Sequence, residues 1–243
     1  MASAPTLFIS DLHLSPDRPG LVDAFHAFID GPARGAAALY VPGDLFDAWL
    51  GDDQLREPLA AGVARAFAGL SASGTPIYLQ RGNRDFLLGE RFARAAGATL
   101  LGDAVVHDVQ GTPTLIMHGD ALCIDDVGYQ RFRAYWQDPV HRRRLLALPY
   151  FARLGIAALF RATSRRATAG KPESIMDVNP GAVADALHAQ GVSRLIHGHT
   201  HRPARHQLTV DGRACERYVL ADWYTTASYL RVDSAGVTSC STG

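Results

Sequence analysis

Excess charge of either sign is absent from this sequence. Its 243 residues include 24 Lys and Arg and 24 Asp and Glu, so the formal net charge at pH 7 is zero. Because no global positive field attracts polyanions, this balance argues against a protein whose partner is nucleic acid. The charge is uneven locally, however, because arginines gather within residues 142–166.

Cysteine is scarce. The chain has three cysteines, Cys123, Cys215 and Cys240, which is an odd number, and no two of them form a CxxC pair. This pattern argues against a disulfide framework and against a cysteine-ligated zinc site, and it favours a reducing compartment.

Long uncharged apolar runs are also missing. None reaches the ~20 residues that a membrane-spanning helix needs. The N-terminal stretch "MASAPTLFIS" has neither the basic region nor the apolar core of a signal peptide. We therefore expect a cytoplasmic protein that is soluble or peripheral to a membrane.

Three short apolar runs rich in strand-forming residues occupy 6–10, 38–43 and 75–80. Helical patterns separate them, with apolar residues at helical spacing in 21–28 and a second helix predicted over 54–70. This alternation of strand and helix predicts stacked βαβ units and a mainly parallel sheet.

The rest of the chain adds mostly antiparallel strands. Residues 104–119 have the pattern of a hairpin, and further strands are predicted at 193–198, 202–210, 213–221 and 227–233. The predicted fold class is α/β, a layered sandwich of two mixed β-sheets flanked by helices. We expect residues 1–243 to form one domain.

Residues 125–170 interrupt this order, because they contain no strand pattern. Two or three helices are predicted there, with Pro139 and Pro149 near helix starts. Residues 145–160 are apolar on nearly every helical face, and the flanking arginines are Arg142, Arg143, Arg144, Arg161, Arg165 and Arg166. This pattern suits a segment lying on anionic lipid, or a lid over an acylated anionic ligand. An ordinary helical hairpin that packs its apolar faces on itself is the alternative.

Polar side chains recur just past the ends of the predicted strands. They are Asp11, His13, Asp44, Asn83, His118, His199 and His201. Because functional sites of open α/β sheets lie at the carboxyl ends of strands, these side chains are expected to converge. The pairs 11/13 and 199/201 point the same way if the chain there is extended.

Carboxylate, carboxamide and imidazole ligands together suit Mn²⁺, Fe²⁺, Co²⁺ or Zn²⁺. Seven groups exceed the needs of one ion, so a shared carboxylate could hold two ions roughly 4 Å apart, as in two-metal phosphoryl-transfer sites. Taken alone, Asp44 is more typical of a helix N-cap, and one histidine is more often structural than a ligand. Five such motifs in series favour a metal site.

The motifs D-x-H, G-D, G-N, H and G-H-x-H, in this order over residues 8–202, resemble those of the calcineurin-like metallophosphoesterases. The resemblance implies a two-metal hydrolase in which water is the nucleophile. It implies that one metal is bound by Asp11, His13 and His201, that the other is bound by Asn83, His118 and His199, and that Asp44 bridges them. Asp85 and Asp120 either orient these ligands or are turn residues.

Arg84 follows Asn83, where the usual loop of this family has a histidine that protonates the leaving group. An ester expels an alkoxide, which benefits from a general acid. A pyrophosphate expels a phosphate with a second pKa of about 6, which barely needs a proton. Arginine can hold two phosphoryl oxygens, so Arg84 fits pyrophosphate cleavage. The alternative is a surface salt bridge from Arg84 to Asp85 or Asp52.

The stretches "ISDLHLS", "GDLFDAWLGDD", "GNRDFLLG", "HGDALCIDD", "SIMDVN" and "HGHTHRP" resemble one branch of this superfamily, the UDP-2,3-diacylglucosamine pyrophosphohydrolases of lipid A biosynthesis. The resemblance implies hydrolysis of the nucleotide-linked glycolipid to UMP and 2,3-diacylglucosamine 1-phosphate (lipid X). It also implies Mn²⁺ as the metal and peripheral attachment to the cytoplasmic face of the inner membrane. The resemblance further implies that residues 125–170 form a helical cap that holds the acyl chains.

The same resemblance implies a set of substrate-contacting positions. They are Asn83, Arg84, Asp126, Ser164, Thr168, Lys171 and His199. Thr168 departs from the branch, where asparagine is expected, and a hydroxyl lacks the paired donor and acceptor of an amide. Asp126 and Ser164 could instead be helix caps.

Three other functions remain open from the sequence alone. The first is a general two-metal phosphomonoesterase or phosphodiesterase acting on nucleotides, which would turn over simple esters and ignore acyl chains. The second is a membrane-binding scaffold with a vestigial metal site, which the complete set of ligand types disfavours. The third is a nuclease, which the zero net charge disfavours.

Overall fold

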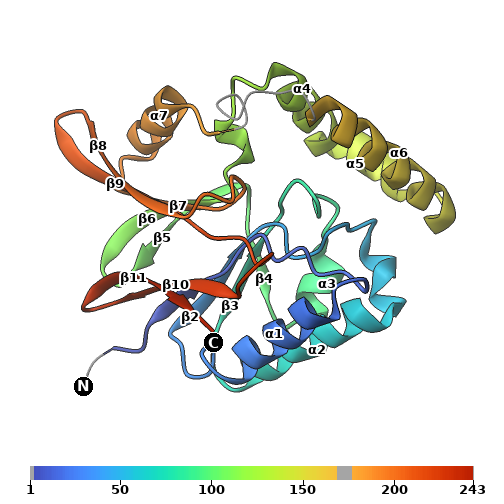
Figure 1. Cartoon of the computed structure of the whole chain (residues 1–243), viewed down its shortest axis with the longest axis horizontal. Coiled ribbons are helices and arrows are strands. Elements are labelled where there is room, and N and C mark those ends of the chain that lie inside the picture. Colours follow the sequence, from blue (N-terminus) through green and yellow to red (C-terminus); the bar gives the residue numbers. More distant parts are fainter. Residues whose placement is uncertain (1–2, 169–176, 243) are drawn as a thin grey trace.

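The computed structural model describes residues 3–168 and 177–242, and the side chains of all of these except 160–168. Two β-sheets lie face to face (Figure 1). The first has the strand order β11-β10-β1-β2-β3-β4 and the second β5-β6-β7-β9-β8. The strands of the first sheet are β1 Thr6–Phe8, β2 Ala38–Pro42, β3 Ile77–Gln80, β4 Thr99–Leu100, β10 Ser228–Asp233 and β11 Gly236–Ser241. Those of the second are β5 Ala104–Val109, β6 Thr112–Met117, β7 Arg194–His197, β8 Ala204–Val210 and β9 Arg213–Val219.

Helices cover the outer faces of both sheets, which gives the predicted layered sandwich (Figure 1). The helices on the first sheet are α1 Pro19–Asp30, α2 Pro58–Ala72 and α3 Glu90–Ala95, and α7 Pro180–Gln190 covers the second. Proline occupies the first turn of α1, α2 and α7, where its missing N–H costs no hydrogen bond. The predicted fold class is therefore confirmed.

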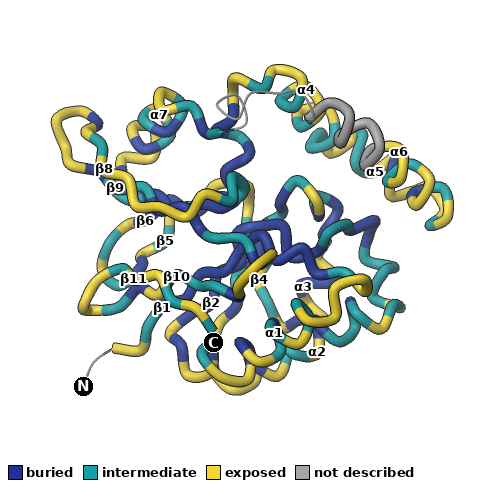
Figure 2. The backbone as a smooth tube through the Cα atoms, in the orientation of Figure 1, coloured by how far each residue is buried: buried dark blue, intermediate teal, exposed yellow. Residues whose placement is uncertain are grey.

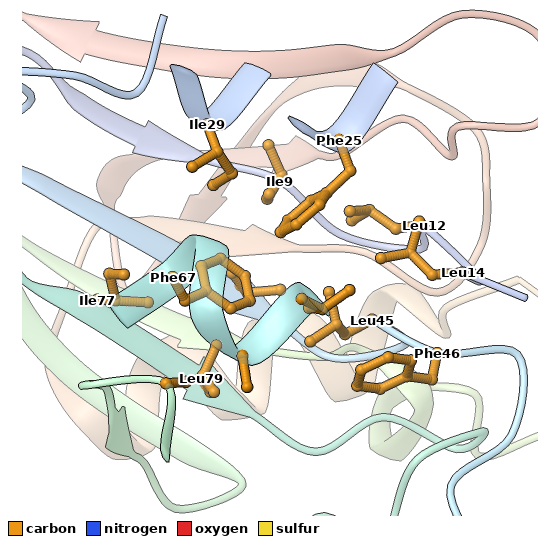
Figure 3. Close-up of a cluster of buried hydrophobic side chains, with 14 of the residues drawn as sticks. Ile9, Leu12, Leu14, Phe25, Ile29, Leu45, Phe46, Phe67, Ile77 and Leu79 are labelled. Atoms are coloured by element: carbon orange, nitrogen blue, oxygen red, sulfur yellow. The ribbon is translucent and has the colours of Figure 1, made fainter. Parts of the chain in front are cut away.

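The parallel strands β1, β2 and β3 are short and mostly buried, because helices cover one face and the second sheet the other. On the helix side, Phe25 and Phe67 meet edge to face and pack against Ile9 (Figure 3). Between the sheets, Phe8 belongs to a separate buried cluster with Ile196. Both faces of β1 are thus fixed by packing, which holds its carboxyl end in place.

Several predicted boundaries are wrong. The helix predicted over 54–70 is interrupted, because a 3-10 turn over Asp52–Arg56 ends before Pro58, which begins α2. The third antiparallel segment, β10, leaves its sequence neighbours and pairs with β1 and β11 in the other sheet. Its residues Leu230 and Val232 join the cluster between the sheets, which explains the switch. The short β4 and α3, the helix α7 and the terminal strand β11 were not predicted.

Three helices occupy the segment predicted to be helical. They are α4 Val127–Gln137, α5 Pro139–Leu146 and α6 Tyr150–Thr168. Pro139 opens α5, and Pro149 immediately precedes α6, as predicted. The three helices extend from one side of the sandwich and expose much of their surface (Figures 1 and 2). None of the helices that the structure describes is long and apolar enough to span a membrane.

Polar contacts attach these helices to the sandwich. Arg153 of α6 is buried, and its guanidinium pairs with Asp53 and donates to the Leu50 carbonyl. The Tyr150 hydroxyl donates to Glu57. Helix α4 buries none of its residues and is held differently, through Asp120.

Candidate metal centre

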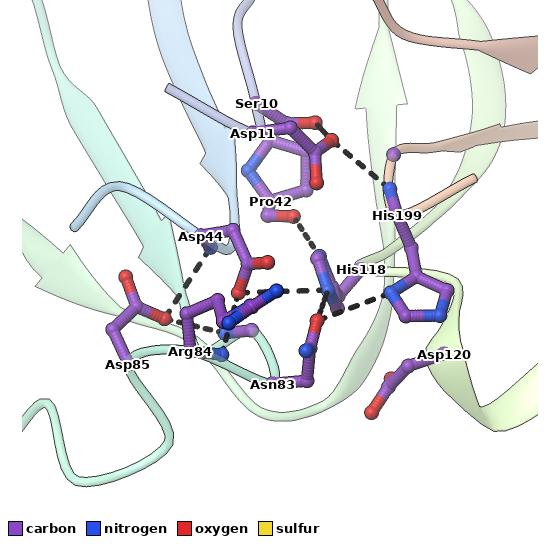
Figure 4. A network of polar contacts seen from close by, with 12 residues as sticks. Ser10, Asp11, Pro42, Asp44, Asn83, Arg84, Asp85, His118, Asp120 and His199 are labelled. Atoms are coloured by element: carbon purple, nitrogen blue, oxygen red, sulfur yellow. Dashed lines mark hydrogen bonds and ion pairs between the residues drawn. The ribbon is translucent and has the colours of Figure 1, made fainter. Parts of the chain in front are cut away.

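Five loops converge where the central strands end (Figure 4). They follow β1, β2, β3, β6 and β7 and carry all seven predicted polar residues. Two overlapping groups could each hold a cation, with their ligand atoms all within 4.8 Å of one another: Asp11, His13 and His201, and Asp11, Asp44 and His118. The predicted convergence is therefore present.

The backbone at this centre is left-handed at five of the predicted residues. Asp11, His13, Asp44, His199 and His201 have φ between 49° and 71°. The extended chain on which the predicted common direction of the pairs 11/13 and 199/201 depended is therefore absent at these four residues. Such conformations cost on the order of 1 kcal/mol or more each in non-glycine residues and persist where surrounding structure imposes them. Here Leu12 and Leu14 are buried in the core, which leaves their polar neighbours to face the centre.

One side of the centre joins Asp11, His13 and His201. Asp11 Oδ1 lies 3.3 Å from His201 Nε2, and the Nε2 atoms of His13 and His201 are 3.4 Å apart. Asp11 Oδ1 and His13 Nδ1 are buried and make no hydrogen bond within the described part of the chain. A buried carboxylate oxygen that makes no hydrogen bond and faces two imidazoles is a donor set that suits a divalent cation.

The other side joins Asn83, His118 and His199. Asn83 Oδ1 lies 3.0 Å from His118 Nε2 and 3.1 Å from His199 Nδ1. Asp44 lies between the two sides, with Oδ1 3.7 Å from His118 Nε2 and Oδ2 3.9 Å from His13 Nε2. One carboxylate thus faces both groups, which is the arrangement expected of a bridging ligand.

Burial dominates the electrostatics of the centre. It lowers the pKa of His13 to about 3 and that of His199 to about 4, so both imidazoles are neutral at pH 7, as metal ligands must be. Burial raises the pKa of Asp44. It opposes protonation of His118, but the charges of Asp44 and Asp11 outweigh it and raise the pKa of that imidazole. A positive charge is therefore favoured beside these carboxylates.

Asp85 ties two of the loops together. Its buried carboxylate accepts hydrogen bonds from the backbone N–H groups of Gly82 (2.7 Å) and Leu45 (2.8 Å), with longer bonds from Asp44 and Phe46. The sequence left Asp85 as either a turn residue or a residue that orients the metal ligands. In the structure it lies in the loop after β3 and also fixes the backbone of Asp44.

Asp120 connects the centre to α4. Its Oδ2 accepts from the Tyr129 hydroxyl at 2.7 Å and from Arg133 Nε at 2.8 Å, and its carbonyl accepts from Gln130 Nε2 at 2.8 Å. We call Asp120, Tyr129 and Arg133 the α4 tether. The Tyr129 ring also stacks over His199 at 6.0 Å, so this helix lies directly against one side of the centre.

The side chain of Arg84 is exposed at the rim, while its backbone N–H donates to Asp44 Oδ1 at 2.8 Å. Neither predicted salt bridge forms among the described residues. Asp85 is occupied by backbone donors, and Asp52 accepts from the backbone N–H groups of Gly89 and Arg91. The salt-bridge alternative is therefore wrong, and the guanidinium is available to a ligand.

The remaining predicted substrate contacts lie on or beyond the helices. Asp126 is the N-cap of α4 and accepts from the Tyr129 N–H at 3.0 Å, as the capping alternative predicted. Ser164 lies within α6, so it is not a helix cap. Thr168 is the last residue of α6, and Lys171 falls outside the described residues.

Several residues around the centre were not predicted from the sequence. The Ser10 hydroxyl donates to Asp11, Asp222 Oδ2 lies 3.4 Å from His201 Nδ1, and the Tyr224 ring stacks on His13 at 5.2 Å. Asp222 follows a strand, as the predicted ligands do, and that signal could have found it. Tyr224 carries no such signal, because only the fold brings it to His13.

The calcineurin-like phosphoesterase family model matches residues 4–203. A protein of Stenotrophomonas maltophilia (strain K279a) named UDP-2,3-diacylglucosamine hydrolase is 49% identical over 95% of this chain and 96% of its own length. Another of that name from Enterobacter sp. (strain 638) is 50% identical over 96% of each chain. An archaeal phosphodiesterase structure, 12% identical, covers 98% of this chain and 99% of its own with a TM-score of 0.49. With a family model matched over most of its length and relatives near half identity, this chain belongs to the calcineurin-like phosphoesterases.

Proposed function

We propose that this protein hydrolyses the pyrophosphate bond of UDP-2,3-diacylglucosamine to UMP and 2,3-diacylglucosamine 1-phosphate, a step of lipid A biosynthesis. The observation that carries the proposal is Arg84, a guanidinium without a carboxylate partner among the described residues, at the rim of the centre beside Asn83. The names of the relatives near 49% identity supply the substrate.

Two divalent ions, most suitably Mn²⁺, are proposed for the centre. One set of ligands is Asp11, His13 and His201, the other is Asn83, His118 and His199, and Asp44 is shared. Two observations support this assignment. Asp11 Oδ1 is buried and makes no hydrogen bond among the described residues. The lowered pKa values of His13 and His199 keep both imidazoles neutral at pH 7, as metal ligands must be. When bound, such ions lower the pKa of water towards neutrality and neutralise phosphoryl charge.

The protein's own side chains then hold the substrate. Arg84 donates to phosphoryl oxygens on both sides of the scissile bond and compensates the charge of the departing phosphate. That phosphate has a second pKa of about 6, so it leaves without a proton donor in the position of Arg84. Asp44 and Asn83 keep fixed positions because backbone hydrogen bonds to Asp85 hold their loops.

Helices α4 to α6 are proposed as a cap, inserted in a single phosphoesterase domain, that holds the acyl chains. Apolar side chains are exposed there, with Phe151 76% and Leu159 61% accessible. Arg142 to Arg144 on α5 would attract anionic headgroups. The same surface supports a peripheral location on the cytoplasmic face of the inner membrane.

Further substrate contacts are proposed at the ends of this cap. Asp126, Ser164 and Thr168 would bond sugar hydroxyls or amides, and Lys171 would meet phosphate charge. Asp126 can do so while capping α4, because a carboxylate has two acceptor oxygens.

The test is Mn²⁺-dependent release of UMP from UDP-2,3-diacylglucosamine in detergent, beside the deacylated UDP-sugar and p-nitrophenyl phosphate. We expect strong turnover of the acylated substrate alone. Arg84→Ala should lower that rate about 100-fold, since a charge-assisted contact to a transition state is worth roughly 3 kcal/mol. Equal or better turnover of p-nitrophenyl phosphate by the wild type would instead identify a general phosphoesterase.

A further inference from the structure

A hollow of about 640 Å³ lies between the start of α1 and the loop after β9. Its principal lining residues are Arg18, Leu21, Ala24, Trp223, Tyr224 and Thr225. We call it the Arg18–Tyr224 pocket. Trp223 is fully buried and its Nε1 donates to the Ser228 carbonyl at 2.7 Å, which fixes its position in the pocket lining.

This pocket shares a wall with the candidate metal centre. The Tyr224 ring is parallel to His13 at 5.2 Å and meets His201 edge to face at 5.5 Å. Two residues earlier, Asp222 contacts the other nitrogen of His201. The pocket and the centre therefore adjoin each other across the Tyr224 ring.

A positive charge lies against this wall. The Arg18 guanidinium lies 4.6 Å from the centre of the Tyr224 ring, and among the described residues no carboxylate pairs with it. An aromatic ring beside such a cation suits a ligand that has both an anionic group and a planar polar ring.

The α4 tether occupies the opposite side of the centre. Tyr129 stacks over His199, whereas Tyr224 stacks on His13. Helices α1 and α4 correspondingly lie on opposite sides of the strand ends (Figure 1). A pyrophosphate diester carries one substituent on each phosphorus, so a lipid half under the cap leaves the other half pointing towards Arg18.

We propose that the Arg18–Tyr224 pocket binds the nucleoside monophosphate half of the substrate, with the Arg18 guanidinium donating to the carbonyl oxygens of the pyrimidine. This proposal rests on the proposed function, because that function supplies a substrate with a uridine half. The lipid half then leaves on the cap side, and UMP leaves past α1.

The test is direct binding of the two products to the Mn²⁺-loaded protein by titration calorimetry. Arg18→Ala should weaken UMP binding about tenfold, the value of one charge-assisted hydrogen bond, and leave binding of 2,3-diacylglucosamine 1-phosphate within twofold. Arg18→Lys should recover part of the loss. Arg34→Ala is the matched control, because Arg34 pairs with Asp30 on an exposed surface beyond the far end of α1.

Tyr224→Leu is the second variant. Because Tyr224 also contacts His13, Mn²⁺ binding to this variant is measured by electron paramagnetic resonance, which distinguishes a loss of metal affinity from a loss of nucleotide affinity. Reduced UMP affinity with unchanged Mn²⁺ binding would support the pocket. Unchanged UMP affinity in both variants, equal losses for both products, or no UMP binding to the wild type would overturn it. Binding of UMP does not require turnover, so failure to hydrolyse the glycolipid would refute the proposed function separately.

Discussion

Replacing Arg133 with methionine tests how the cap is held against the metal centre. Arg133 Nε donates to Asp120 Oδ2 at 2.8 Å, and the two side chains are 18% and 7% exposed. Its second partner, Asp103, is 3.2 Å away and half exposed. Methionine keeps the apolar stem and removes both contacts.

The buried contact dominates the expected effect. A hydrogen bond between charged groups at low exposure is worth about 2 kcal/mol, whereas the exposed pair with Asp103 is worth less than about 1 kcal/mol. Helix α4 buries none of its residues fully, although its half-buried Trp136 packs against the core, so apolar packing compensates part of the loss. A change of about 2 kcal/mol shifts the equilibrium between attached and detached α4 roughly thirtyfold.

The assay compares two substrates. We expect kcat/KM for the acylated UDP-sugar to fall about tenfold or more in Arg133→Met, and the slow turnover of the deacylated sugar to change less. Amide hydrogen exchange should be faster throughout α4 and unchanged in β1 to β3. Arg131→Met is the control, because Arg131 is exposed on the same helix and lies outside the tether.

Two results would refute this reasoning. One is Arg133→Met with the same hydrogen-exchange protection in α4 as the wild type. The other is an equal loss of kcat/KM on both substrates, which would place the effect at the metal centre and not at the cap.

Further predictions concern stability and metal. Phe67→Ala, at a fully buried position, should lower the free energy of unfolding by about 3–5 kcal/mol in urea titrations, and a loss below 1 kcal/mol would contradict the packing described. Burial works against ionisation of Asp53, but the hydrogen bond and charge of Arg153 prevail and lower its pKa. This pair therefore stabilises the fold above the ordinary carboxyl pKa and loses that contribution as pH falls through the lowered value. Between pH 5 and pH 3, which lie on either side of the reference carboxyl pKa of about 3.9, the Tm of the wild type should fall more steeply than that of Arg153→Met. Mn²⁺ should raise Tm relative to chelator because it binds only the folded centre, and a Tm insensitive to metal would argue against the site.

Much of the fold could be predicted from local patterns. Short apolar runs identified β1, β2 and β3, and the position of Asp11, Asp44 and Asn83 just past them identified the centre. These inferences succeeded because strand ends converge whatever the details of the loops.

Features that depend on distant packing could not be predicted. The position of β10 beside β1 follows from the cluster between the sheets, and no local pattern distinguishes it from pairing with β9. The left-handed backbone at His13 likewise accompanies the burial of its neighbours Leu12 and Leu14 in the core. Tyr224 reaches His13 only because the chain returns after β9 to the end of β1.

The proposed two-metal hydrolysis is tested most directly by UMP formation from UDP-2,3-diacylglucosamine by the Mn²⁺-loaded protein and by its His118→Ala variant, in the same detergent. We expect turnover by the wild type, abolition by chelator with recovery on adding Mn²⁺, and a loss of at least about 100-fold in the variant, since His118 is a proposed ligand. No UMP from the wild type, or undiminished UMP from the variant, would contradict it.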